Sequence, residues 1–136
     1  MGMIYAEIEL LNASDVYQAR KNLIDHDEVK RIRVNMLVDT GSYVLAINQT
    51  IQEVLQLPLI TRQRVWLASN KTEEHDLVGP IEIRYQDKTT SCNAIVLPGD
   101  CEPLLGAVPM EAMEVLVDPL RQELIVNPEI RRGRYF

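Results

Sequence analysis

The sequence of 136 residues predicts a mostly β fold, a closed β barrel that carries one or two short helices. Apolar residues alternate with polar ones in several short segments, and this is the period of a half-buried strand. Turn-forming residues separate the segments, and the strands do not alternate with long helices as they do around a parallel sheet. At this length we expect a single domain over 1–136 with one hydrophobic core.

Eight segments have the composition of strands. They are rich in β-branched and apolar residues, and most are bounded by Gly, Pro, Asn or Asp. The polar stretches 69–76 and 86–88 predict a hairpin tip and a second turn between strands. The predicted strands are residues 4–11, 29–38, 43–47, 64–68, 77–83, 89–97, 115–117 and 123–126.

Two further segments predict short helices. One covers residues 48–55, because Asn48 can cap its N-terminus and Pro58 can end it. The other covers about residues 109–113, after the apolar element that ends at Gly106.

Two segments outside the predicted core differ from it in composition. Residues 12–27 are polar with weak helical spacing, and they predict a mobile loop or a short helix inserted before the core. The core of the fold is expected over about 29–127, and a basic tail follows over 128–136.

Composition excludes several function classes. The net charge of −6 argues against a nucleic-acid partner, which needs a positive surface. The longest apolar stretches are too short to span a membrane, and the N-terminus has no basic segment followed by an apolar one, so we expect a cytoplasmic protein. Cys92 and Cys101 are expected to be buried or idle thiols and not a disulfide.

The most informative motif follows the apolar run that ends at Val38. Asp39 supplies a carboxylate, Thr40 a hydroxyl that can brace the loop, and Gly41 a backbone that amides can approach closely. This strand followed by Asp-Thr-Gly is similar to the catalytic loop of an aspartic protease. The motif occurs once, and that chemistry needs two carboxylates that share a proton, so the hypothesis requires a homodimer.

The order of the motifs resembles that of the retropepsin-like aspartic proteases, the single-lobe relatives of pepsin found in retroviruses and in cellular genomes. The shared pattern is an apolar strand into Asp-Thr-Gly-Ser, a flap hairpin, and two apolar residues before a Gly and a short helix. Here these parts are residues 37–42, the hairpin over 64–83 and Leu104-Leu105-Gly106. The resemblance covers about 29–127 and is closest to bacterial members of the group.

The resemblance implies an endopeptidase without a metal or organic cofactor, whose substrate is a peptide or protein. Asp39 of each chain would hold one water, one carboxylate acting as base and the other as acid. Thr40 would donate across the dimer axis, Gly41 would leave room for substrate, and Leu105 with Gly106 would support the loop. The hydroxyl of Ser42 can hydrogen-bond the ionised carboxylate, which predicts activity at more acidic pH than in Ser42→Ala.

The resemblance also assigns a flap, with Trp66, Leu67, Ala68 and Ser69 as the residues expected to cover substrate. Its predicted tip is charged, whereas viral flaps are rich in Gly and apolar residues. A second departure is an ion pair of the viral enzymes, because its two positions correspond here to Tyr43 and Ala107. Both partners are missing together, which leaves no orphaned buried charge.

Less specific interpretations exist for each motif. Asp39 could be an ordinary turn residue, Leu104 to Gly106 a buried strand that ends at a Gly, and Trp66 a packing residue at the flap base. Residues 74–76 do not have the spacing of a metal site and predict a solvated loop. The competing function is a catalytically idle module that dimerises or binds peptides; a regulatory protein that uses the tail and the 12–27 insert is a remote third.

Overall fold

The computed structural model describes residues 3–66 and 69–128. Within these ranges the chain forms strands, three short α-helices and one turn of 3₁₀-helix, η1. In chain order the elements are β1 (Ile4–Asn12), α1 (Ala13–Arg20), η1 (His26–Glu28), β2 (Arg31–Val38), β3 (Leu45–Asn48), α2 (Gln49–Leu55), β4 (Leu59–Trp66), β5 (Thr72–Tyr85), β6 (Lys88–Leu97), β7 (Leu104–Leu105), α3 (Ala107–Met113), β8 (Val115–Asp118) and β9 (Glu123–Val126).

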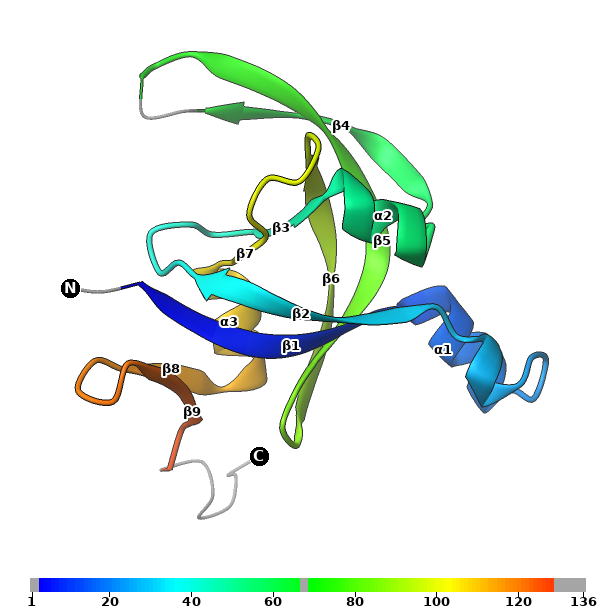
Figure 1. The fold of residues 1–136 in the computed structure, drawn as a ribbon. Helices are drawn as coiled ribbons and strands as arrows, with labels where there is room; N and C mark the ends of the chain where they lie inside the picture. The colour runs from blue at the N-terminus through cyan, green and yellow to red at the C-terminus, as the bar shows by residue number, and fades with distance from the viewer. Residues whose placement is uncertain (1–2, 67–68, 129–136) are drawn as a thin grey trace, which may run out of the picture.

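Seven strands form one curved sheet in the order β1-β2-β7-β3-β6-β5-β4, and β5 also pairs with β1 (Figure 1). Most pairs are antiparallel, whereas β2 with β7 and β3 with β6 run parallel. The hairpin β8-β9 forms a second, two-stranded sheet that lies beside α3. The mostly β prediction is therefore confirmed, and closure of the sheet into a barrel stays a prediction.

The core follows from the alternation of the strands. In β1 the side chains of Ile4, Ala6, Ile8 and Leu10 are buried, while the residues between them face outward. They pack against apolar side chains of β2, β3, β5 and the helices, with Leu105 fully buried among them. This continuous core holds the short strand β7 at the centre of the sheet.

The first half of the 12–27 insert forms the helix α1, one of the two alternatives that the sequence predicted there. Asn12 caps α1 by accepting a hydrogen bond from the Asp15 amide at 3.1 Å. Asp15 is buried, and its carboxylate accepts from both the backbone amide and the ammonium of Lys30, each at 3.1 Å. A small apolar cluster of Leu11, Val16, Ala19 and Val29 completes the contact, so α1 is docked on the sheet. No helix in the described ranges is long and apolar enough to span a membrane.

Several predicted boundaries were wrong. The β4-β5 hairpin begins at Leu59 and its second strand begins at Thr72, so residues 72–76 belong to a strand and not to the predicted tip. Cross-strand pairing of Arg62 with Asp76, which sequence spacing does not show, extends the ladder. In the described ranges the structure has three α-helices because the insert forms α1, where a short helix was one of the two predicted alternatives. The helices α2 and α3 and the β8-β9 hairpin lie where the sequence places them, within a few residues.

Candidate active site

The Asp-Thr-Gly loop lies at the end of β2, between that strand and β3. The amide of Leu37 donates to the carbonyl of Pro103 at 3.1 Å, and the amide of Asp39 donates to the carbonyl of Leu105 at 3.0 Å. Val38 and Leu105 are directly paired, and Leu105 also pairs with Leu45 of β3. The strand β7 thus inserts between β2 and β3 and fixes the start and the end of the loop.

Gly106 allows the backbone of β7 to pass unusually close to the loop. A Cβ at this position would lie 2.3 Å from the carbonyl oxygen of Val44 and 2.8 Å from that of Ser42. Directly after Gly106, the amide of Ala107 donates to the Ser42 carbonyl at 2.7 Å. Only a residue without a side chain permits this crossing, so Gly106 supports the loop through its own backbone contacts.

The same crossing explains why the strand predicted over 43–47 begins only at Leu45. The carbonyl of Tyr43 accepts from the amide of Val108 at 3.1 Å, at the start of α3. The backbone carbonyls of residues 42–43 therefore accept hydrogen bonds from the first turn of α3 and not from a neighbouring strand. The structure brings Ser42, Leu105 and Gly106 close to Asp39, and adds Val44 and Val108, which no motif indicated.

The carboxylate of Asp39 is half-buried at the surface of the loop. Its Oδ1 accepts a 3.0 Å hydrogen bond from the amide of Gly41. Among the described residues the Ser42 hydroxyl does not hydrogen-bond this carboxylate, so the role expected for Ser42 is not present within one chain. Thr40 and Gly41 are exposed, and this leaves the tip of the loop open to a partner molecule.

A largely apolar pocket of about 280 Å³ opens beside Asp39. It combines the start of β1, the end of β2 and the hairpin β8-β9, three parts of the chain that are distant in sequence. Its lining residues are Met3, Ile4, Leu37, Val38, Asp39, Thr40 and Val117. An ionisable group in a partly apolar hollow is a common arrangement in binding and catalytic sites.

The surface beside the loop is apolar where viral enzymes carry an ion pair. The side chain of Tyr43 is 76% exposed and that of Val108 is 56% exposed. Ala107 is half-buried in the first turn of α3 and has no charge to offer. The two positions that hold the ion pair in viral enzymes are thus occupied here by uncharged side chains, those of Tyr43 and Ala107.

The predicted flap residues lie at the free end of the β4-β5 hairpin. Trp66 is the last residue of β4 and is 71% exposed, so it is not a packing residue at the flap base. Ser69 is exposed in the connection, whereas Leu67 and Ala68 lie outside the described residues. In Figure 1 the hairpin projects on the same side of the molecule as the loop between β2 and β3.

The described residues offer neither a metal site nor a disulfide. No group of three His, Cys, Asp or Glu side chains within residues 3–66 and 69–128 is arranged to hold a metal ion. Cys92 is partly buried and Cys101 is exposed, and both are free thiols.

Comparison with known proteins identifies the fold. No protein-family model matches the chain, and no curated protein matches it. Among solved structures, the retroviral protease-like domain of Ddi1 from Leishmania major is similar, with a TM-score of 0.58 at 12% sequence identity. The likeness covers 94% of this chain and 90% of that domain, and it does not bear on the bacterial group that the sequence resembles. The chain thus has a retropepsin-like fold.

Proposed function

We propose that the protein is an aspartic endopeptidase whose active site forms between two copies of the chain, with Asp39 of each as the catalytic pair. The observation that carries the proposal is the position of Asp39, at the end of β2 in a loop fixed by β7 and Gly106. The retropepsin-like fold supports it, because the sequence resemblance that assigns Asp39 to catalysis implies this same fold.

The mechanism follows from the chemistry of two close carboxylates. Like charges that share a site cannot both ionise, so one carboxylate stays protonated while the other is charged. The charged member takes a proton from water, which attacks the peptide carbonyl, and the protonated member donates to the carbonyl oxygen. The Gly41 amide, which already donates to Asp39, holds the carboxylate in one orientation during these transfers.

The surface around the loop suits contact with a second copy. Thr40 and Gly41 are exposed at the tip, and the exposed apolar side chains of Tyr43 and Val108 flank it. Apolar and aromatic side chains at the centre of a contact contribute most to its stability. In the dimer Thr40 would donate to the partner loop, as the family resemblance implies. The β4-β5 hairpin would cover a bound peptide, and the cell compartment we propose is the cytoplasm.

Subunit mixing tests the shared site directly. Mixed dimers of wild type and Asp39→Asn contain one carboxylate and one amide, so they should be inactive. Titrating Asp39→Asn into wild type should therefore lower the peptidase rate below that of wild type alone, and the wild-type rate should rise faster than linearly with concentration. A rate that the variant does not lower, and that is proportional to concentration, would rule out a site shared between subunits.

The second candidate is a catalytically idle module of the same fold that dimerises or binds peptides. The exposed apolar side chains beside the loop fit this function equally well, because dimerisation and peptide binding do not require a catalytic reaction. The two candidates differ in the role of the carboxylate. Asp39→Asn should leave sedimentation and peptide binding unchanged in either case, and only the peptidase loses its reaction.

A further inference from the structure

The β4-β5 hairpin leaves the body of the sheet at one point. Pairing between β5 and β6 begins at Leu77 with Ile95, whereas residues 72–76 of β5 pair only with β4. The hairpin beyond Leu77 is therefore a two-stranded ribbon, and such ribbons are marginally stable unless something else holds them. Any side chain that ties residues 72–76 to β6 has a large influence on the position of the hairpin.

His75 makes that tie. Its Nδ1 lies 3.1 Å from the carbonyl oxygen of Val96 in β6, and its Nε2 lies 3.0 Å from a carboxylate oxygen of Glu73. The side chain is only 11% exposed, while that of Glu73 is 52% exposed. The sequence predicts a solvated loop here, yet the imidazole is largely buried and contacts the backbone of β6.

Both ring nitrogens face hydrogen-bond acceptors. A neutral imidazole has one N–H, so it can donate to Val96 or to Glu73 but not to both. The imidazolium has two and satisfies both acceptors at once, with a charge-assisted bond to Glu73. Only the imidazolium therefore donates to both acceptors that the structure places around the ring.

We propose that His75 is a proton-dependent anchor of the β4-β5 hairpin. Protonated His75 joins the hairpin to β6, and loss of the proton releases one of the two bonds. Histidine side chains lose their proton between about pH 5 and 8, so the anchor weakens as pH rises through this range. It does not depend on peptidase activity.

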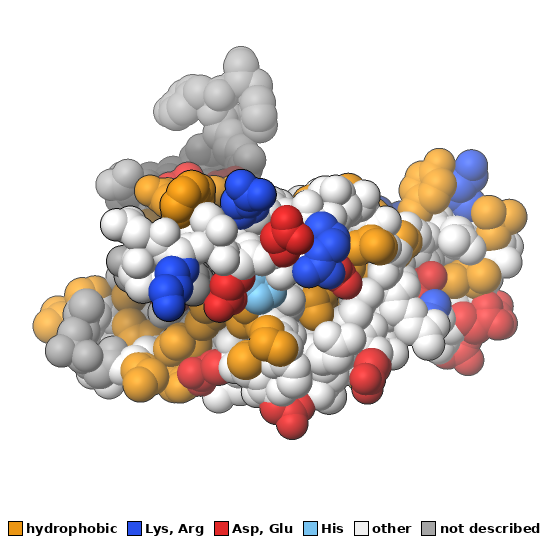
Figure 2. Space-filling view, turned by 90° about the horizontal axis from the view of Figure 1, so that it is seen from above, with side chains coloured by type: hydrophobic (Ala, Val, Ile, Leu, Met, Phe, Trp, Pro, Cys, Tyr) orange, Lys and Arg blue, Asp and Glu red, His pale blue; other side chains and the backbone are white. Residues whose placement is uncertain are grey.

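The other charged groups around His75 are already paired. Arg62 of β4 binds Asp76 at 2.9 Å and the backbone carbonyl of Glu74 at 3.1 Å. From α2 and β6 the neighbouring side chains, Gln49, Val96 and Pro98, carry no charge. Figure 2 looks down on the face with the hairpin, where acidic and basic side chains surround a histidine. Glu73 is thus the charged group that contacts the imidazole of His75 directly.

One further charge lies in the loop between β6 and β7, which follows the strand that His75 contacts. Asp100 accepts a hydrogen bond from the hydroxyl of Thr50 at 2.5 Å, and this bond ties the loop to α2. Its carboxylate is engaged there and is not a partner of the imidazole. The dependence on pH should therefore come from the pair His75 and Glu73.

The chain has two histidines, which makes the test direct. The ¹⁵N shifts of both rings in the full-length protein should be followed by NMR from pH 5 to 8, together with hydrogen exchange of the amides of residues 72–76. After correction for intrinsic rates, exchange should speed up about threefold to tenfold as His75 loses its proton, which corresponds to one lost hydrogen bond. In His75→Gln this dependence on pH should vanish.

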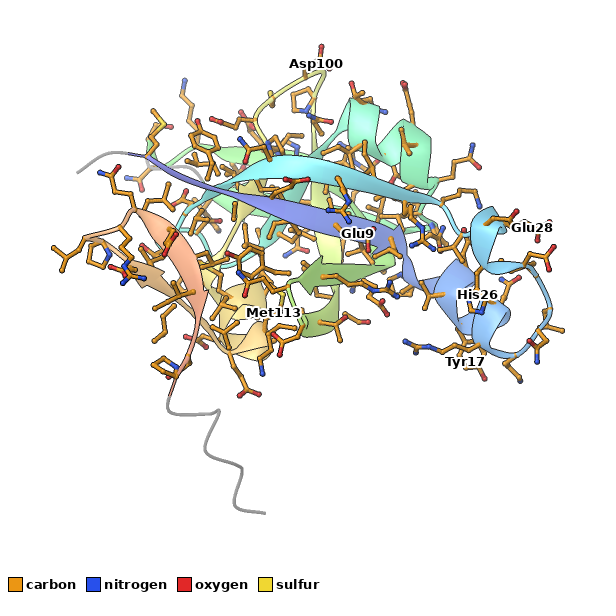
Figure 3. The ribbon with its side chains drawn as sticks, turned by 60° about the horizontal axis from the view of Figure 1, so that its bottom comes forward. Glu9, Tyr17, His26, Glu28, Asp100 and Met113 are labelled. Carbon is orange, nitrogen blue, oxygen red and sulfur yellow. The ribbon has the colours of Figure 1, made fainter. Side chains whose placement is uncertain are left out.

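His26 provides the internal control. It is exposed in η1 and lies with Tyr17 and Glu28 at the α1 end of the molecule, away from Asp100 (Figure 3). His26→Gln should leave the exchange of residues 72–76 unchanged at every pH.

A second pair of variants keeps the test valid if His75→Gln does not fold. Glu73→Gln keeps an oxygen that can accept from Nε2 but removes the negative charge that faces the imidazolium, and Glu74→Gln removes a neighbouring charge that contacts Arg62 instead. Only Glu73→Gln should flatten the dependence on pH. A His75 ring that stays neutral from pH 5 to 8, or equal dependence on pH in wild type and Glu73→Gln, would overturn the proposal.

Discussion

The backbone amide of Asp39 donates a hydrogen bond of 3.0 Å to the carbonyl oxygen of Leu105. This contact joins the end of β2 to a strand of two residues that comes much later in the chain. The position of the carboxylate therefore depends on β7 and on the start of α3 as much as on β2. Changes in β7 should consequently affect the site although they lie far from it in sequence.

Gly106→Ala tests this dependence. Its new Cβ would lie within 3 Å of backbone atoms of Ser42 and Val44, and backbone cannot move aside as a flexible side chain can. We expect the free energy of unfolding to fall by about 3 kcal/mol. Urea denaturation followed by circular dichroism measures this loss, and a midpoint equal to that of wild type would contradict the close crossing.

Gly41→Ala is the matched control for that substitution. A Cβ at Gly41 would meet only the carboxylate oxygen of Asp39, at 3.3 Å. The unfolding free energy should stay within about 1 kcal/mol of wild type, because the residue is exposed. Peptidase activity should nevertheless fall, since the methyl group crowds the reacting carboxylate. Stability and activity should thus separate between the two glycines.

Asp15→Ala should release α1 from the sheet. The substitution removes the acceptor for the amide and the ammonium of Lys30, and the amide is left without a partner near a buried cluster. Because Lys30 is partly exposed, we expect a loss of about 1–3 kcal/mol. Hydrogen exchange should show that protection falls first in α1.

The exposed acid Asp27 supplies the comparison, because Asp27→Ala should change the unfolding free energy by less than about 0.5 kcal/mol. Equal losses in the two variants would mean that the Asp15–Lys30 contact does not stabilise the docking of α1.

The two cysteines should differ sharply in reactivity. Burial raises the pKa of the Cys92 thiol from 9.0 to about 11, so at pH 8 only about one molecule in a thousand carries the reactive thiolate. Cys101 is exposed and open to reagent. A thiol reagent at pH 8 should modify one thiol per chain quickly and the second only on unfolding.

Cys101→Ser identifies which thiol reacts first, because it should abolish the fast phase and keep the slow one. As pH rises from 9 toward 11, Cys92 ionises more readily in the unfolded chain than in the folded one. The slow phase should therefore accelerate and stability should fall. Two thiols that react at equal rates in native protein would show that Cys92 is not shielded.

Local patterns in the sequence predicted most strands. The alternation in β1 and the turn at Gln86 and Asp87 are local signals, and they appear in the structure close to where they were expected. The single Asp-Thr-Gly motif also sits at a strand end beside Leu105, as the order of motifs indicated.

Two elements that the sequence did not predict clearly, the start of β5 and helix α1, are held by contacts between segments distant in the chain. The first part of β5, residues 72–76, has the composition of a polar turn, because its stability comes from pairing with β4 and from the His75 contact with Val96. Helix α1 had only weak amphipathic spacing, and it forms because Asn12 caps it and Lys30 pairs with Asp15. None of these contacts leaves a periodic trace in the sequence.

The proposed peptidase activity depends above all on Asp39 as a catalytic residue. The most direct measurement is mass-spectrometric detection of cleavage in a pool of unfolded-protein peptides from mildly acid to neutral pH, with wild type and Asp39→Asn at matched concentration. Because the Asn side chain keeps an oxygen that can accept from the Gly41 amide, the variant should fold as wild type does. We predict cleavage by wild type and none by Asp39→Asn; equal cleavage by both proteins, or none by a wild type shown by sedimentation to be dimeric, would contradict the account.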